Sequence, residues 1–369
     1  MIHVCEPAIG KEEIENVMDA LKSNEISGSF GKYIDQFEND FSRYCGVKHG
    51  IATTSGTTAL HLALASLGIK EEDEVILPAL TNIATAFAVV YCGARPVVVD
   101  SERDTWNMNT DLIEEKITKR TKVILPVHIY GHPVDMNPIS DLAKRHRLLV
   151  VEDVAEAHGA EYFGKKVGGL GNIGCFSFYA NKIIVTGEGG MVVTNNEKIA
   201  DQARLLRNLA FSKEQRFRHH FIGFNYRMTN VQAAIGVAQL NKIDEIIERK
   251  RKIAHSYNAL LREIPGIVLP PEKSWAKNVY WMYSILIEEE FGLERDHLMK
   301  KLAESGIETR TFFIPMNQQP IFREMGLFEN EGCPVAEELS RKGLYLPSSV
   351  ALTESQVGFI VETIKKIRG

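Results

Sequence analysis

Between about residues 48 and 195, seven short apolar segments alternate with amphipathic stretches, and this alternation restricts the possible folds more than any other feature. The segments are GIATT, EVILPA, RPVVVD, KVILPV, LLVVED, GCFSF and GGMVVT. Strands that are apolar on both faces and separated by helices indicate a mainly parallel sheet covered on both sides. The sequence therefore predicts an α/β fold whose ligand site lies at the carboxyl ends of the strands.

Helical patterns connect and follow these strands. Between KVILPV and LLVVED, Asn137 can cap a helix that Pro138 begins, which completes a right-handed strand-helix-strand unit. A longer pattern without internal proline follows Thr229, a suitable N-cap, and ends near Pro265. We expect this longer pattern to form one helix that bridges two domains.

A chain of 369 residues is long enough for about two domains. We expect a large ligand-binding domain at residues 1–240 and a smaller C-terminal α+β domain at residues 241–369. In the smaller one, YWMYSILI and IETRTFFI are the expected strands. The amphipathic segments 295–305 and 353–367 are its expected helices.

The charge and cysteine content argue against several other classes of protein. Lys and Arg number 43 against 48 Asp and Glu, and the net charge of -5 gives no general attraction to nucleic acid or anionic membranes. The five cysteines are scattered without a CxxC pair, so we expect no metal site. No basic segment leads into an apolar one at the start, and the most apolar stretch, residues 83–92, is too short to span a bilayer. We expect a cytoplasmic enzyme.

Lys182 lies in FSFYANKIIVTGEGGMVVTNN, just after a short apolar strand and before a glycine-rich turn at residues 186–190. A lysine held in such a turn is positioned by the backbone. Its amine could condense with an aldehyde if burial or a neighbouring charge lowers its pKa. The alternative is an ordinary solvated lysine beside a turn.

Asp153 stands at the carboxyl end of LLVVED, on the edge where a parallel sheet presents its ligand. Pyridoxal 5'-phosphate (PLP) needs a carboxylate at such a place, because its ring withdraws electrons best when the ring nitrogen stays protonated. The alternative for Asp153 is a helix N-cap after the strand.

A small polar turn at residues 55–58 follows another strand and precedes an apolar helix, in TTSGTTALHLALASLG. Backbone N–H groups and hydroxyls at a helix N-terminus stabilise a phosphate dianion. The alternative is capping of the helix alone. Neither GxGxxG nor a Walker lysine is present, which argues against a dinucleotide or ATP fold.

A family resemblance runs nearly from end to end of the chain. It is carried by GKYIDQFENDF, SGTTALHLAL, DEVILPALTNIATA, PVHIYG, VEDVAEAHGA, FSFYANKIIVTGEGGMVVTNN, FNYRMTNVQAAIGVAQL and LYLPSSVALTE. On these motifs the chain resembles the sugar aminotransferases of the DegT family, which have the aspartate-aminotransferase fold, PLP fold type I. The resemblance implies a mainly parallel sheet flanked by helices and a smaller α+β C-terminal domain.

The same resemblance implies a role for each site residue. Lys182 is implied to be the Schiff-base lysine and proton shuttle, Asp153 the partner of the ring nitrogen, and Glu156 a neighbour of the ring hydroxyl. The phosphate is implied to bind at four positions of the same subunit, Gly56, Thr57, Thr58 and Ser177. Asn225 of FNYRM is implied to reach the phosphate of the neighbouring subunit, so that a homodimer completes each site.

Four other polar residues near these motifs remain open. Arg227 belongs either to the same contact between subunits or to a surface ion pair. His158 in EAHGA is assigned no catalytic role, because a histidine hydrogen-bonded inside the fold explains it as well. His219 and His220 could meet the nucleotide sugar, but a solvated loop explains them equally.

Two positions depart from the family pattern. Asn82, in PALTNIATA, replaces the aromatic residue whose ring usually stacks on PLP. Loss of offset stacking removes on the order of 1 kcal/mol and should loosen the cofactor without abolishing binding. Ala180 replaces a common glycine, which is a small steric change.

Within the family, VYWMYSI and IETRTFFIPM resemble the GDP-perosamine synthases. The resemblance implies amino transfer from L-glutamate to a nucleotide-linked 4-keto-6-deoxy sugar, with a polysaccharide such as O-antigen or an antibiotic as the destination. Two alternatives stay open. One is a PLP-dependent sugar dehydratase, although such relatives have His where this chain has Lys182. The other is a non-catalytic regulatory or sugar-binding relative, which an intact Lys182 and Asp153 disfavour.

Overall fold

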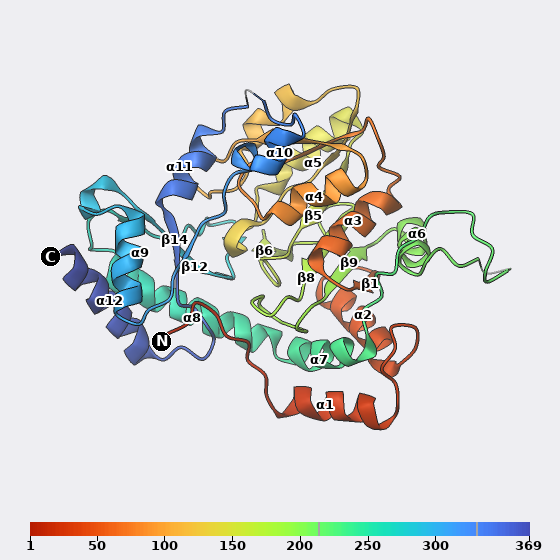
Figure 1. Cartoon of the computed structure of the whole chain (residues 1–369), viewed down its shortest axis with the longest axis horizontal. Coiled ribbons are helices and arrows are strands. Elements are labelled where there is room, and N and C mark those ends of the chain that lie inside the picture. Colours follow the sequence, from red (N-terminus) through yellow and green to blue (C-terminus); the bar gives the residue numbers. More distant parts are fainter. Residues whose placement is uncertain (213–214, 330) are drawn as a thin grey trace.

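The computed structural model describes residues 1–212, 215–329 and 331–369. Its central seven-stranded sheet has the order β1-β9-β8-β5-β4-β2-β3. Figure 1 shows strands β1, β5, β8 and β9 of this sheet among the surrounding helices. Neighbouring strands from β8 to β3 run parallel, whereas β9 is antiparallel to β1 and to β8. The strands are β1 (His49–Thr53), β2 (Glu74–Pro78), β3 (Arg95–Val99), β4 (Thr121–Ile124), β5 (Leu149–Asp153), β8 (Ile173–Ser177) and β9 (Gly190–Thr194). The predicted strands and the α/β fold are therefore confirmed.

Helices flank this sheet. Helix α3 packs against β5, β8 and β9, α4 against β2 and β3, and α6 against β1 and β9, while α1 and α2 both pack against α7. Their bounds are α1 (Lys11–Lys22), α2 (Lys32–Tyr44), α3 (Gly56–Ser66), α4 (Ile83–Tyr91), α5 (Met136–His146), α6 (Glu197–Arg207) and α7 (Asn230–Asn241). Within the described ranges, no helix combines the length and the apolar character that a membrane crossing requires.

The start of α5 differs from the prediction. The N-cap is Asp135, whose carboxylate accepts a hydrogen bond from the Asn137 backbone N–H at 3.3 Å. Asn137 and Pro138 therefore lie inside the first turn, where a proline costs no intrahelical hydrogen bond. The expected cap at Asn137 is wrong, because the aspartate two residues earlier fills that position.

The long helical pattern after Thr229 forms two helices. Thr229 caps α7 as predicted, and its hydroxyl accepts from the Gln232 N–H at 3.2 Å. The helix ends at Asn241, the φ of -116° and ψ of 14° at its C-cap Lys242 leave the helical region, and α8 (Ile243–Leu261) follows at once. The expectation of a single helix is wrong, because α7 packs on α1 and α2 whereas α8 packs on α12 (Glu354–Arg368).

The C-terminal part contains a second, antiparallel sheet of four strands in the order β10-β12-β14-β13. Its strands are β10 (Ile267–Val268), β12 (Tyr283–Ile287), β13 (Arg310–Thr311) and β14 (Gly343–Leu346). The accompanying helices are α9 (Arg295–Glu304), α10 (Pro320–Glu324) and α11 (Pro334–Lys342). A third small sheet joins β11 (Ala276–Lys277) to β6 (Glu161–Tyr162) and β7 (Lys165–Lys166). Short 3-10 turns lie at Thr110–Leu112, Glu114–Lys116, Ile129–Gly131, Glu289–Phe291 and Met316–Gln318.

The buried apolar residues form two cores, one around the central sheet and one around the C-terminal sheet, and α8 contributes residues to both. Ile246 and Ile247 pack in the core of the central sheet, whereas Ile253 and Tyr257 pack in the core of the C-terminal sheet. The first core also takes in Tyr345 and other late residues. The division at residue 240 stays a prediction.

Candidate active site

A cavity of about 800 Å³ opens at the carboxyl ends of β5 and β8. It is lined by residues of α3 and its cap, the two strand ends, and the C-terminal part, among them Ser55, Gly56, Thr57, Asn82, Asp153, Glu156, Ser177, Lys182, Trp281, Arg310 and Tyr345. The cavity thus lies on the predicted edge of the sheet. Among the described residues no cluster of His, Cys, Asp and Glu could hold a metal ion.

Lys182 projects into this cavity from the turn after β8. Its backbone N–H donates to the Tyr179 carbonyl at 2.9 Å, which fixes the turn. Its Nζ lies 3.8 Å from Glu156 Oε1 and 3.9 Å from the centroid of the Trp281 ring. Burial lowers the pKa of Lys182, and the carboxylates of Glu156 and Asp153 oppose that shift. The buried amine thus meets the requirement for condensation with an aldehyde.

Asp153 ends β5 with its carboxylate buried on the cavity wall. One oxygen accepts from the Thr85 hydroxyl at 2.9 Å and the other from the Ala155 backbone N–H at 3.1 Å. Burial raises the pKa of Asp153, while these two hydrogen bonds hold it down. No helix follows β5, since residues 154–160 form turns before β6. Asp153 therefore caps a turn through the Ala155 N–H, and the alternative of a helix N-cap is wrong. Thr85, on α4, carries no sequence signal that would have identified it.

Glu156 lines the same wall three residues further along the chain. Its Oε2 accepts from the Tyr130 backbone N–H at 3.0 Å, which leaves Oε1 on the side of Lys182. Burial raises the pKa of Glu156 to about 7, although the Lys182 charge works against this rise. Near neutral pH this carboxyl can therefore hold or release a proton.

The N-terminus of α3 forms a polar recess beside β8. The N-cap Ser55 accepts from the Thr58 N–H at 3.1 Å, and Thr58 Oγ1 accepts in turn from the Ser55 N–H at 2.9 Å. Thr58 thus serves the cap and is not among the residues that line the cavity. Gly56 and Ser177 do line it, and a Cβ on Gly56 would lie 2.6 Å from the Ser177 Cβ. Because Gly56 carries no side chain, α3 can begin this close to β8. The backbone N–H groups and hydroxyls at this helix N-terminus line the cavity and fit the phosphate of PLP.

Asn82 lines the cavity and also has a structural task. It caps α4, where its side chain accepts from the Ala84 N–H at 3.0 Å. Asparagine is among the best N-cap residues, whereas an aromatic side chain cannot accept this bond. At this position a residue that caps α4 therefore replaces the aromatic residue of the family pattern.

His158 is enclosed by aromatic rings and does not line the cavity. Its ring packs against Phe41, Phe176 and Phe178 at centroid distances of 6.4, 5.3 and 5.7 Å. Neither ring nitrogen has a hydrogen-bond partner among the described residues. Burial, helped by the Lys182 charge, lowers the pKa of His158 to about 3. His158 is therefore a residue buried inside the fold, next to the backbone of Ser177.

The FNYRM motif lies outside this cavity. Asn225 is exposed and its backbone pairs with that of Asn208, whose side chain accepts from Arg227 Nη1 at 2.6 Å. His219 Nδ1 lies 2.9 Å from the Leu209 carbonyl oxygen, and His220 is exposed. Asn225 thus contributes nothing to the cavity of its own chain.

Sequence reasoning missed three side chains from the C-terminal part, Trp281, Arg310 and Tyr345. The Trp281 Nε1 donates to the Asn181 carbonyl at 2.7 Å, which turns the indole face toward Lys182. Trp281 and Arg310 lie in the motifs that carry the subgroup resemblance, and Tyr345 lies in the family motif LYLPSSVALTE. No local pattern in these motifs shows that the three side chains reach a site formed by much earlier residues.

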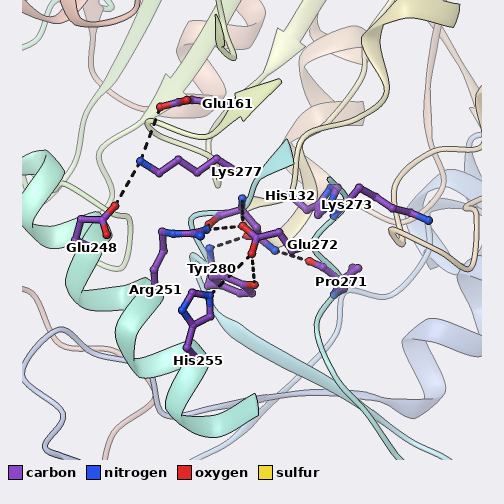
Figure 2. Close-up of polar contacts among 11 residues, drawn as sticks. His132, Glu161, Glu248, Arg251, His255, Pro271, Glu272, Lys273, Lys277 and Tyr280 are labelled. Atoms are coloured by element: carbon purple, nitrogen blue, oxygen red, sulfur yellow. Dashed lines mark hydrogen bonds and ion pairs between the residues drawn. The ribbon is translucent and has the colours of Figure 1, made fainter. Parts of the chain in front are cut away.

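A carboxylate hub holds the segment before Trp281 against α8 (Figure 2). Glu272 pairs with Arg251 of α8, accepts from the Asn278 backbone N–H at 2.9 Å, and accepts from the Tyr280 hydroxyl at 3.1 Å. Tyr280 has a φ of 47°, in the left-handed region that non-glycine residues rarely adopt. These contacts of Glu272 therefore stabilise the turn at Tyr280, which positions the Trp281 side chain in the cavity.

Comparison with known proteins gives a consistent picture. Residues 7–365 match the model of the DegT/DnrJ/EryC1/StrS aminotransferase family. GDP-perosamine synthase from Escherichia coli O157:H7 is 44% identical over 99% of this chain and 98% of its own length, and that from Caulobacter vibrioides is 43% identical with the same coverage. The solved structure of S. venezuelae DesV with a ketimine intermediate is 35% identical, with a TM-score of 0.91 over 97% of this chain and 94% of its own. The chain therefore belongs to the DegT/DnrJ/EryC1/StrS aminotransferase family, whose cofactor is PLP.

Proposed function

We propose that this aminotransferase moves the amino group of L-glutamate to a nucleotide-linked 4-keto-6-deoxy sugar, as a GDP-perosamine synthase would. One observation carries the proposal: Lys182, Asp153 and the N-terminus of α3 all line one cavity. The names of the relatives that share over 40% of the sequence support the sugar substrate.

Each residue has a task that its surroundings support. PLP, when bound, supplies the electron sink that makes a neighbouring C–H acidic. Lys182 Nζ would move the proton, because its lowered pKa lets the neutral amine form. Asp153 would hold the proton on the ring nitrogen, and Glu156 would bind at the ring hydroxyl. Gly56, Thr57 and Ser177 would bind the phosphate, with Thr58 acting through the helix cap.

The proposal includes a symmetric homodimer in which Asn225 reaches the phosphate in the partner's cavity. Its exposure and its position outside the cavity of its own chain support this arrangement. Mixing inactive Lys182→Ala chains with weakened Asn225→Ala chains tests it, because a hybrid dimer regains one intact site. Failure of such mixtures to recover activity would argue against shared sites. The proposal also places the enzyme in the cytoplasm and its product in polysaccharide synthesis.

The test of the reaction uses enzyme loaded with PLP. L-Glutamate should remove the visible absorption band, and the correct member of a panel of nucleotide-linked 4-keto sugars should restore it. Mass spectrometry should then find an aminated sugar, and Lys182→Ala should abolish the conversion. A deoxygenated sugar would indicate a dehydratase, and PLP binding without any response to amino donors would indicate a non-catalytic protein.

A further inference from the structure

The C-terminal wall of the cavity, which we define as Trp281, residues 310–314 and Tyr345, places a cation beside a hydroxyl. Arg310 of β13 pairs in register with Tyr345 of β14, and both residues line the cavity. Residues directly opposite each other in an antiparallel pair have their side chains on the same face of the sheet. The guanidinium and the phenol therefore lie side by side at the cavity.

Several N–H donors of the Arg310 guanidinium are not used by its ion pair. Its Nη2 and Nε donate to the same Glu308 Oε1, at 3.2 and 3.4 Å, and half of its side chain is exposed. The other oxygen of that carboxylate is engaged by the His3 Nδ1 at 3.0 Å and the Val4 N–H at 3.2 Å. A guanidinium has five N–H donors, so one carboxylate oxygen leaves most of its fork available. Apart from Lys182, Arg310 is the only cationic side chain among the described residues that line this cavity.

Tyr345 presents a buried hydroxyl without a partner. The residue is 4% exposed, and its hydroxyl makes no hydrogen bond within the described part of the chain. The Tyr130 ring packs edge-on at 5.2 Å, and the Tyr130 hydroxyl accepts from the Phe313 N–H at 3.4 Å. Burial, together with the neighbouring Tyr130, raises the pKa of Tyr345 well above its usual range, so the hydroxyl keeps its proton. A buried polar atom of this kind at a cavity wall points to a ligand.

We propose that Arg310 and Tyr345 form an anion subsite that binds the distal carboxylate of the amino donor. The inference rests on the proposed function and extends it, because it explains a preference for a dicarboxylic donor such as glutamate. A guanidinium binds a carboxylate through two parallel hydrogen bonds, and the phenol supplies a third. A phosphate oxygen of the nucleotide sugar has the same anionic chemistry, so the test must separate the two ligands.

Calorimetric titration of the PLP-loaded enzyme provides that separation. Glutarate, which has both carboxylates and no amine, represents the donor, and GDP represents the nucleotide. We expect Arg310→Gln to weaken glutarate binding at least tenfold, Arg310→Lys to restore part of it, and Tyr345→Phe to weaken it several-fold, with GDP binding unchanged. Arg43→Gln is the matched control, because Arg43 is a surface arginine paired with Asp40 and should alter neither ligand.

A kinetic measurement separates binding from misfolding. In the donor half-reaction, Arg310→Gln should raise the half-saturating concentration of glutamate at least tenfold but leave that of alanine, which has no distal carboxylate, nearly unchanged. Unchanged glutarate binding in Arg310→Gln, or an equal or larger loss for GDP, would overturn the proposal. If the glutarate result holds while no 4-keto sugar is aminated, the subsite stands and the proposed function fails.

Discussion

The Nζ of Lys182 lies 3.9 Å from the centre of the Trp281 indole, and the same indole donates its N–H to the carbonyl of Asn181, the residue before the lysine. One side chain from the C-terminal part thus holds both the backbone and the amine of the reactive turn. The face of an aromatic ring attracts a cation, so this contact favours the protonated lysine.

Replacement of Trp281 should therefore change the protonation of Lys182. A desolvated cation–π contact is worth roughly 2 kcal/mol, and about 1.4 kcal/mol corresponds to one pKa unit. We expect Trp281→Leu to lower the pKa of Lys182 by about one unit, and Trp281→Phe to lower it by less. The pH dependence of PLP loading into the apo enzyme measures this shift. A shift toward higher pH would show that water entry outweighs the lost contact.

Asp153 gives a second prediction. Asp153→Asn keeps the shape and the Thr85 contact but removes the charge that would hold the ring-nitrogen proton. A hydrogen bond to a charged group contributes about 1.5–3 kcal/mol, so turnover should fall about 10- to 150-fold while PLP remains bound. Thr85→Val removes the hydroxyl that donates to Asp153 and that contacts the Thr81 hydroxyl at 3.0 Å, and it should have a smaller effect. Stopped-flow measurement of the glutamate half-reaction compares the two, and equal rates in Asp153→Asn and the wild type would contradict the assigned role.

The approach of Gly56 to Ser177 predicts a steric effect. In Gly56→Ala the new Cβ would lie 2.6 Å from the Ser177 Cβ, so α3 and β8 must move apart. Such overpacking costs about 1–3 kcal/mol, and the displaced recess should bind PLP more weakly. Gly358→Ala is the matched control, because a Cβ there meets nothing within 4 Å and α12 should gain about 0.5–1 kcal/mol. Denaturant unfolding and PLP titration report the two quantities.

His158 makes the stability of the apo protein depend on pH. Its pKa is about 3 in the folded chain against 6.5 for a free side chain, so between these values only the unfolded chain takes up this proton. The free energy of unfolding should therefore fall as the pH drops from 6.5 toward 3, by up to about 1.4 kcal/mol per unit from this group. His158→Phe keeps a ring beside Phe176 and should lose that part of the slope. Parallel pH profiles for both proteins would show that His158 is not responsible.

Local patterns predicted the central sheet because each strand contains its own run of apolar residues. A parallel sheet binds its ligand at the carboxyl ends of its strands, and this rule predicted that Lys182 and Asp153 share one site. The same reasoning failed where contacts between distant segments decide the outcome. The break at Lys242 follows from the different packing partners of α7 and α8, which no periodicity shows. Arg310 reaches the cavity through the pairing of β13 with β14, and Trp281 through the turn that Glu272 holds. Their neighbours along the chain carry no sign of either contact. The roles of the individual site residues remain predictions.

Because α8 contributes to both apolar cores, we expect the two cores to unfold together. A continuous helix buried at both ends transmits the loss of either core to the other, since neither half of the helix is stable alone. Melting of the C-terminal sheet would also remove Trp281, Arg310 and Tyr345 from the cavity. We expect a single cooperative calorimetric transition, in which binding competence and the central sheet disappear together.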